Sequence, residues 1–303
     1  MELLKRLFGW VNRQAWLVLT LTTLIWGGNV VAGRSAVGEM SPLSLVSLRW
    51  FFAFAMIAVF AREEARRDFP MIGRAWPRLI VMGALGFTTF NALFYIAARY
   101  TSGVSLAILQ GSTPIFVMAG AALVFAQRFR ALQWMGLAVT TFGVVMIATQ
   151  GDPRNLSTLQ FNRGDVYCVI ACALFAVYSL GLRNRPPISA MSLFAAMSLA
   201  AFASSVPLAI WEIAQGQAMW PTPKGWAILA YIAIGPSFLG QLLWMRGVAL
   251  IGPARAGLYY NLTPVFGSML SVLILREAFG WHQGLALALV LGGIALAERK
   301  AGS

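Results

Sequence analysis

Long apolar segments joined by short charged connections dominate this sequence. Each segment is close to the roughly 20 residues that a helix needs to cross the hydrocarbon core of a bilayer. The segments are placed at 15–33, 43–61, 76–98, 102–125, 132–149, 165–182, 189–211, 226–248, 254–275 and 281–297. Only 11% of the residues are charged and 59% are hydrophobic, whereas a soluble domain carries roughly 25% charged residues. The sequence therefore predicts an all-α integral membrane protein with ten transmembrane helices.

Basic residues fall unevenly on alternate connections between these segments. One set of connections, which includes both ends of the chain, holds sixteen Lys and Arg residues, and the other set holds six. Because basic connections stay in the cytoplasm, both termini are predicted to be cytoplasmic, with 1–14 as an N-terminal segment and 298–303 as a tail. No small-residue cleavage site precedes the first apolar segment, so 15–33 is interpreted as a retained span and not as a signal peptide.

The two halves of the chain carry related features at a spacing of 150 residues. Thr113-Pro114 in the first half then corresponds to Thr263-Pro264 in the second. Division into the halves 15–150 and 164–297 gives five predicted spans to each, and because five is odd, the second half must enter the membrane from the opposite side. Inverted repeats of this kind are a recurring construction of secondary transporters, with the substrate site between the repeats near the bilayer midplane.

Pro114 and Pro264 both lie inside long apolar segments. A proline there removes one backbone hydrogen bond and clashes with the preceding turn, so each is expected to mark a bent helix. Two matched interruptions in the two halves of a membrane protein indicate a central binding site, and we predict that the two prolines act as hinges. The alternative is that each is a packed kink with no function.

Several short stretches of the sequence resemble a known family. They are LIWGGNVVA at 24–32, LRW at 48–50, ARYTS at 98–102, the two Thr-Pro pairs and Arg276-Glu277. In their order and spacing they are similar to bacterial EamA-type members of the drug/metabolite transporter superfamily, and within it most similar to YddG-like exporters of aromatic and other amino acids. The resemblance implies a fold of two inverted five-helix repeats, a place in the bacterial inner membrane, and the export of amino acids.

Polar side chains within the predicted spans are expected to face the protein interior, because a donor or acceptor that faces lipid is left unsatisfied. The amides are Asn29, Asn91, Gln110, Gln241 and Asn261, and the aromatic residues beside them are Trp26, Tyr95, Tyr178, Trp244 and Tyr260. Several of these amides share a helical face with a ring at i, i+3 or i, i+4 spacing. Together they predict a cavity that suits a small amphipathic molecule. The alternative is that the amides only join helices and the rings only fill the core.

Arg49 lies well inside the second predicted span, at a depth where a charge is costly. It is expected either to pair with Glu39 or with backbone carbonyls, or to meet a carboxylate of the substrate. Acidic residues fall near the ends of the spans and none lies in the middle of one, so the intramembrane carboxylate of many proton-coupled transporters is missing. The sequence therefore favours facilitated diffusion, or coupling through a group near one mouth of the cavity.

Other functional classes find little support in the sequence. The chain has one histidine, two cysteines at i, i+4 spacing and no H-E-x-x-H motif, so neither a metal or other cofactor nor enzyme activity is predicted. Its basic residues lie in connections, so nucleic acid is not an expected partner. The predicted function is export of amino acids or related small amphipathic metabolites by alternating access. The alternatives are export of drug-like or other metabolites, and an intramembrane enzyme or receptor.

Small residues indicate where helices approach closely. Gly284, Ala288 and Gly292 form a row on the last predicted span, and Gly136 with Thr140 partly repeats the row on the fifth. These rows are expected to pack the fifth and tenth spans together within a monomer surrounded by lipid. The alternative is that they form the contact of a homodimer.

Overall fold

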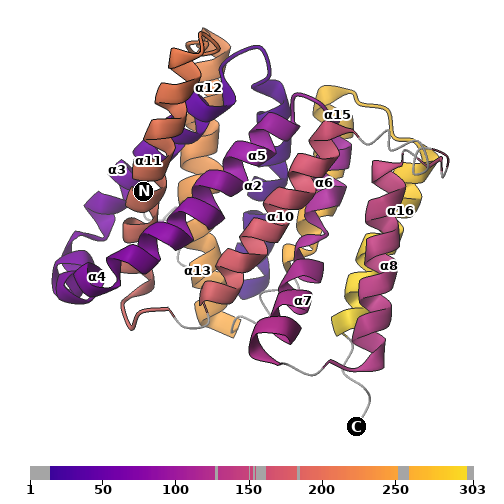
Figure 1. Cartoon of the computed structure of the whole chain (residues 1–303), viewed down its shortest axis with the longest axis horizontal. Coiled ribbons are helices and arrows are strands. Elements are labelled where there is room, and N and C mark those ends of the chain that lie inside the picture. Colours follow the sequence, from indigo (N-terminus) through magenta and orange to yellow (C-terminus); the bar gives the residue numbers. More distant parts are fainter. Residues whose placement is uncertain are drawn as a thin grey trace.

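A computed structural model describes residues 14–126, 129–149, 151–152, 154, 162–182, 185–251 and 259–298. Most of the predicted N-terminal segment, most of the predicted tail and residues 254–258 of the ninth predicted span lie outside these residues. Every regular element in the described part of the chain is a helix. The helices lie side by side in one bundle, with the first and second halves of the sequence interleaved (Figure 1).

The helices of the first half are α2 (Ala15–Ser35), α3 (Pro42–Phe60), α4 (Arg62–Gly83), the π-helix η1 (Ala84–Thr89), α5 (Phe90–Ala97), α6 (Gly103–Gln110), α7 (Thr113–Phe125) and α8 (Ala131–Ala148). Those of the second half are α10 (Arg163–Gly181), α11 (Ala190–Ala214), α12 (Pro223–Ile232), the π-helix η3 (Ala233–Leu239), α13 (Gly240–Ile251), α15 (Leu262–Leu275) and α16 (Trp281–Glu298).

Seven helical stretches among the described residues are long and apolar enough to cross a membrane. They are Ala15–Ser35, Pro42–Phe60, Arg62–Ala97, Gly103–Phe125, Arg163–Gly181, Ala190–Ala214 and Pro223–Ile251. Three shorter apolar helices cover Ala131–Ile147, Leu262–Leu275 and Trp281–Leu296. The prediction of an all-α membrane protein is therefore confirmed for the described residues, while the count of ten spans stays a prediction.

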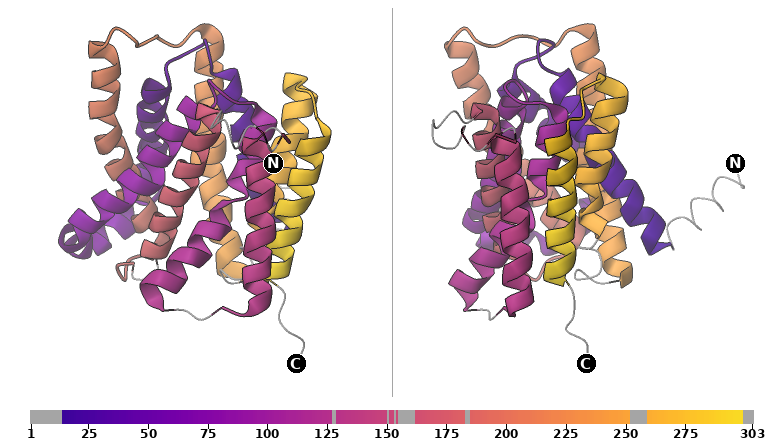
Figure 2. Two further views of the ribbon diagram at one scale, coloured as in Figure 1. Left: turned by 45° about the vertical axis from the view of Figure 1, so that its right-hand side comes forward. Right: turned by 90° about the vertical axis from the view of Figure 1, so that its right-hand side faces the viewer.

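The segment before the third predicted span is also helical. α4 begins at Arg62 and carries exposed arginines along its first turns, among them Arg66 and Arg74. It leans outward from the bundle at its start and then continues through η1 into α5 (Figure 2). Phe69 is 70% exposed, so this end of α4 presents both charged and apolar groups, as a helix at a membrane surface does.

Two π-helical segments interrupt long helices at matching positions of the two halves. η1 joins α4 to α5, and η3 joins α12 to α13. A π-helical turn shifts the register of the side chains and leaves backbone groups available, and such turns are frequent at functional sites. In η3, Pro236 has no N–H to donate, and the Ser237 hydroxyl donates to the Ile232 carbonyl over 2.7 Å. A proline therefore accounts for the π-helical turn of the second half, whereas η1 in the first half contains no proline.

The span that contains Pro114 is broken and not simply bent. α6 ends at Gln110, residues 111 and 112 form a turn, and α7 begins at Thr113. The N–H groups of Gly111 and Ser112 donate to the carbonyls of Ile108 and Leu109, each over 2.9 Å. Pro114 therefore lies in the first turn of α7, where its missing N–H costs nothing. Pro264 likewise lies in the first turn of α15, directly after a turn at Asn261.

The fifth and tenth predicted spans pack together as α8 and α16, which lie side by side at one edge of the bundle (Figures 1 and 2). The row predicted for this contact on α16 is wrong in register. A Cβ on Gly293 would lie 2.2 Å from the Thr140 hydroxyl, whereas Gly292 has no atom within 4 Å of such a position among the described residues. Ala286, Val290 and Gly293 form the contact face, one or two positions from the predicted row, and each position turns the helix by about 100°.

One end of the bundle is held together by carboxylates that accept hydrogen bonds from the first N–H groups of helices. Glu277 accepts from the N–H groups of Gly103 and Val104 at the start of α6, over 2.9 and 3.0 Å. Arg34 lies 3.7 Å from the same carboxylate and donates to the Ala98 carbonyl over 2.7 Å. A helix N-terminus has unpaired N–H groups and a partial positive charge, so a carboxylate there stabilises it twice over.

Two further carboxylates act at the same end. Glu212, at the end of α11, accepts from the N–H groups of Leu43 and Ser44 at the start of α3, over 3.3 and 2.9 Å. Glu39 accepts from the Thr222 hydroxyl and from Lys224, the latter over 3.0 Å. We call this the capped end, defined by Glu39, Glu212 and Glu277. At the opposite end, Asp68 is the one carboxylate among the described residues that accepts from the start of a helix, at the N–H of Ser189 over 2.9 Å.

Candidate functional site

A cavity of about 270 Å³ lies at the centre of the bundle. Its lining comes from both halves of the chain, including α2, α3, α5 and α6 of the first and α10, α13 and α15 of the second. Of the ten residues predicted from sequence, eight line it: Trp26, Asn29, Asn91, Gln110, Tyr178, Gln241, Trp244 and Tyr260. The volume is close to the lower limit of about 300 Å³ for small-molecule pockets.

The remaining two predicted residues lie elsewhere. Tyr95 is 2% exposed and stands behind the lining, where its hydroxyl donates to the Asn29 side-chain oxygen over 2.9 Å. Asn261 lies in the turn before α15 and is not part of the lining. Tyr95 therefore positions a lining residue, and Asn261 belongs to the interruption of its helix.

The lining also contains residues outside the ten predicted ones, and of these the sequence had raised Arg49 as one candidate partner of a substrate carboxylate. They are Arg49, Trp50, Gly86, Phe87, Phe90, Phe175, Ser179, Leu182, Pro236 and Thr263. Gly86 and Pro236 correspond at the 150-residue spacing, and this was a signal that these positions matter. The phenylalanines carried no such signal, because a phenylalanine in an apolar span is more often core than lining.

Arg49 joins the two halves of the chain through neutral groups. Its Nη1 donates to the Asn91 side-chain oxygen over 2.6 Å and to the Tyr95 hydroxyl. Its Nε and Nη2 both donate to the Ser237 hydroxyl, over 2.9 and 2.7 Å. The side chain is 4% exposed. Of the alternatives raised by the sequence, pairing with Glu39 is wrong, because that carboxylate is bound to Thr222 and Lys224 at the capped end.

Two groups of aromatic rings flank this polar centre. On one side Trp26 lies 5.3 Å from Trp244 and 5.8 Å from Tyr260, measured between ring centroids. The Trp26 indole N–H donates to the carbonyl of Pro236 in η3 over 3.2 Å, so the π-helical segment orients this ring. Such clusters give a cavity large apolar faces with a few polar edges.

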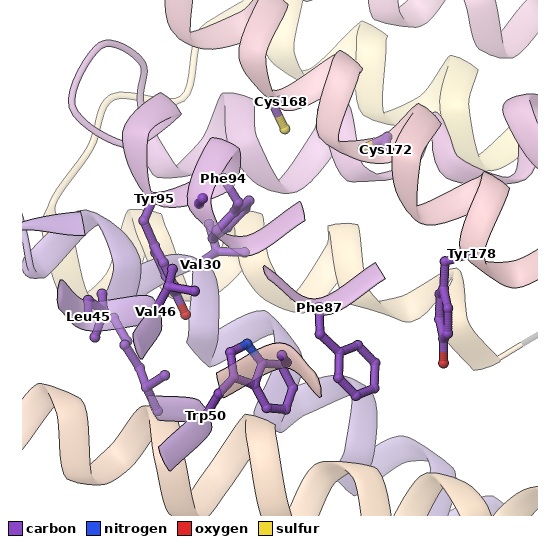
Figure 3. Packing of buried hydrophobic residues seen from close by; sticks show 14 of the residues in the cluster. Val30, Leu45, Val46, Trp50, Phe87, Phe94, Tyr95, Cys168, Cys172 and Tyr178 are labelled. Carbon is purple, nitrogen blue, oxygen red and sulfur yellow. The ribbon is translucent and has the colours of Figure 1, made fainter. Parts of the chain in front are cut away.

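On the other side, Trp50, Phe87 and Tyr178 stand in a row, as Figure 3 shows. Trp50 and Phe87 are stacked at 4.5 Å with an interplanar angle of 5°, and Phe87 lies 5.5 Å from Tyr178. Gly86 permits this arrangement, since a Cβ at that position would lie 2.2 Å from Cγ of Tyr178. The lining therefore combines Arg49 with two groups of aromatic rings, one around Trp26 and one around Phe87.

Several polar groups in the lining have no partner within the described part of the chain. The indole N–H of Trp50 and the hydroxyl of Thr263 are buried without a hydrogen bond, although the two residues are only 4% and 1% exposed. Buried polar groups are nearly always hydrogen-bonded in proteins. The described residues therefore leave both groups without a partner, and a molecule in the cavity reaches them only if the side chains that cover them move.

The lining reaches one end of the bundle more closely than the other. Ser179 and Leu182 lie at the end of α10 opposite to the capped end. Toward the capped end, the Tyr95 hydroxyl donates to the Asn29 side chain, and Tyr95 lies two residues before the end of α5. The cavity is thus best placed for access from the uncapped end.

The cysteines take no part in this site. Cys168 and Cys172 are free thiols, both buried on α10, and Cys168 appears with Cys172 in the core of Figure 3, away from Trp50. Within the described ranges, no cluster of three or more His, Cys, Asp or Glu side chains could hold a metal ion.

A sequence profile of the EamA-like transporter family matches residues 14–149 and again residues 162–298. The chain belongs to the EamA-like transporter family. It is therefore a membrane transporter, and its family implies a small-molecule substrate and a lipid environment.

Individual relatives agree with this membership. The chain is 26% identical to the transporter YyaM of Bacillus subtilis (strain 168) over 83% of each chain. It is 24% identical to the inner membrane transporter YedA of Escherichia coli (strain K12), over 90% of this chain and 87% of the relative. A solved crystal structure has the same fold, with a TM-score of 0.66 at 20% identity, over 93% of this chain and 96% of that chain. The names of these EamA relatives state no substrate.

Proposed function

We propose that this EamA transporter exports amino acids with aromatic or other apolar side chains, or related small amphipathic metabolites, by alternating access through the central cavity. The observation that carries the proposal is the lining, in which two aromatic walls flank a narrow polar centre. Gln110 and Gln241 face this space from opposite halves and make no hydrogen bond within the described residues. Rings suit an apolar side chain, and amides suit the polar groups of the same molecule.

The substrate class follows from the resemblance to YddG-like exporters and from the charge of the lining. Export of a drug-like cation is the alternative, and it is disfavoured because the lining contains an arginine and no carboxylate. The same lack of a carboxylate favours facilitated diffusion over proton coupling, since protonatable acids inside the membrane are the usual proton carriers.

The alternating-access part of the proposal rests on two inverted five-helix repeats, 15–150 and 164–297, with ten spans in total. Matched features support it. The two π-helical segments correspond at the 150-residue spacing, and α8 packs on α16. Glu212 accepts from the start of α3, while Asp68, just after α3, accepts from the start of α11.

The hinge part of the proposal places bending at the interruptions beside Pro114 and Pro264. The excess of basic residues in one set of connections places both termini in the cytoplasm, so the capped end faces the periplasm of a bacterial inner membrane. In the conformation described above, the cavity would receive substrate from the cytoplasm, as an exporter must. One chain contains a complete cavity, so a monomer is sufficient for this function.

Counterflow of labelled phenylalanine in proteoliposomes tests the proposal. We expect saturable counterflow that persists when no proton gradient is present. Gln241→Leu removes an amide from the lining and is expected to lower the rate at least about tenfold, because a hydrogen bond made in the cavity is lost. Gln217→Leu is the matched control, since Gln217 is exposed outside the cavity. Flux that strictly requires a proton gradient would contradict facilitated diffusion, and the absence of any saturable flux would contradict export.

A further inference from the structure

The electrostatic character of the cavity is set by one residue. Arg49 is the one charged side chain in its lining. No carboxylate among the described residues lies within salt-bridge distance of its guanidinium, because Glu39, Glu212 and Glu277 are engaged at the capped end. An ionised group buried away from water is costly unless a counter-charge accompanies it. The described residues leave that counter-charge to be supplied by another molecule.

The hydrogen-bond donors around Arg49 are also incompletely used. A guanidinium has five N–H groups, and four of those of Arg49 are accounted for by Asn91, Tyr95 and Ser237. The remaining one belongs to Nη2 and has no acceptor in the described part of the chain. The indole N–H of Trp50 is a second buried donor without a partner.

These two donors are close together. Cζ of Arg49 lies 5.0 Å from the centroid of the Trp50 ring, and both side chains line the same cavity. Asn91, Tyr95 and Ser237 fix the guanidinium from three sides, while the stacking of Trp50 on Phe87 fixes the indole. A fixed cation and a fixed neutral donor next to each other form a receptor for an anion with two oxygens, for which a carboxylate is suited in charge and shape.

We infer that Arg49 and Trp50 bind the carboxylate of the transported molecule, and that its amino group contributes little to binding. The inference rests on the proposed transport function and narrows its substrate class to small carboxylates with an apolar tail, amino acids included. The tail lies between the aromatic walls formed by Phe87 and Tyr178 on one side and by Trp26 and Trp244 on the other. An ammonium group meets rings and amides in this cavity and no carboxylate.

A set of three matched compounds separates the contributions of the two charged groups. L-Phenylalanine has both groups, 3-phenylpropanoate has only the carboxylate, and phenethylamine has only the ammonium. Each is used to compete with labelled phenylalanine in proteoliposomes, and labelled 3-phenylpropanoate is bound directly to the purified protein. We expect 3-phenylpropanoate to compete within about threefold of phenylalanine, and phenethylamine to compete at least about tenfold more weakly.

Trp50→Phe is the informative variant. It removes the unpartnered N–H and keeps a ring to stack on Phe87, so the variant should fold as well as the wild type. Binding of 3-phenylpropanoate should weaken about five- to tenfold, with no change for phenethylamine. Trp226→Phe, on the exposed face of α12, is the control and should change neither. Arg49→Gln should abolish the preference for carboxylates. If the Arg49→Gln protein does not fold, the Trp50→Phe protein still tests the inference.

The outcomes separate the inference from the proposed function. Saturable phenylalanine flux with phenethylamine as good a competitor as 3-phenylpropanoate overturns the carboxylate site and leaves export standing. Binding of 3-phenylpropanoate that depends on Trp50, without flux of any of the three compounds, supports the site and overturns export. If none of the compounds binds or is transported, both are overturned.

Discussion

The two ends of the bundle are built from different contacts. At the capped end, Glu212 and Glu277 satisfy the first N–H groups of α3 and α6, and Arg34 adds a positive charge. At the other end, the lining of the cavity reaches Ser179 and Leu182 at the end of α10. The capped end is therefore closed by a few charged contacts, in which carboxylates hold together helices from both halves of the chain. This difference explains why an opening can form at one end while the other remains closed.

The carboxylates of the capped end are expected to dominate stability. Glu277→Ala leaves two helix N–H groups without their acceptor and Arg34 without its counter-charge, so the free energy of unfolding should fall by about 2–3 kcal/mol. Unfolding in a mixed detergent and SDS titration measures the change. Glu63→Ala, at an exposed position in α4, should change stability by less than about 0.5 kcal/mol. Equal effects of the two substitutions would remove the distinction between the two ends.

The cavity side of the comparison depends on a close approach. Gly86→Ala would bring a Cβ to 2.2 Å from Cγ of Tyr178, and the resulting displacement should cost about 1–3 kcal/mol and lower transport. The matched substitution Gly73→Ala meets no atom within 4 Å among the described residues and should stabilise α4 by up to about 1 kcal/mol. Thermal unfolding in detergent measures both changes in stability, which should have opposite signs. A stabilised Gly86→Ala protein would show that the Tyr178 ring is free to move.

The proposed hinges should affect motion more than stability. Pro264 lies in the first turn of α15, where a missing N–H is not needed, so Pro264→Ala should change the free energy of unfolding by less than about 1 kcal/mol. We expect it to alter the opening of one face only, as measured by reagent access to cysteines placed at either end. Equal changes at both faces, or at neither, would make the proline part of the scaffold.

The smallest effect is expected from Glu39 and depends on pH. Hydrogen bonds from Thr222 and Lys224 lower the pKa of the Glu39 carboxyl below its usual value of 4.5. A lowered pKa in the folded state means that the contribution to stability is present above pH 4.5 and is lost as the pH falls through the folded-state value. The wild type should therefore melt slightly above Glu39→Gln at pH 7, and the difference should shrink at acidic pH. A difference in melting temperature that grows as the pH falls would contradict this stabilising role of the Glu39 carboxylate.

The sequence alone predicted the helical membrane class and most of the cavity. Long apolar runs leave few alternatives to helices in a bilayer, and an amide inside such a run has few places to point except inward. This is why Asn29, Gln110 and Gln241 could be expected to face inward without any knowledge of the packing, and all three line the same cavity. The prediction depended only on the cost of exposing a polar group to lipid, and this cost can be judged at each position separately.

Features that depend on packing between distant segments were not predictable in the same way. The partners of Arg49 come from α5 and η3, and no local pattern links those segments to α3. The face of α16 that contacts α8 was predicted one to two residues out of place, because positions 284, 288 and 292 and positions 286, 290 and 293 lie on neighbouring faces of one helix. The π-helical turn in η1 also had no local cause comparable to Pro236.

We propose that the cavity is entered from the uncapped end, while carboxylates close the other end. A single cysteine at Ser179→Cys, in a background with Cys168→Ala and Cys172→Ala, tests it most directly with a membrane-impermeant maleimide. We expect labelling in inside-out vesicles, where the cytoplasmic face is exposed, and protection from labelling by 3-phenylpropanoate. Labelling from the periplasmic face of right-side-out vesicles, with none from the cytoplasmic face, would contradict it.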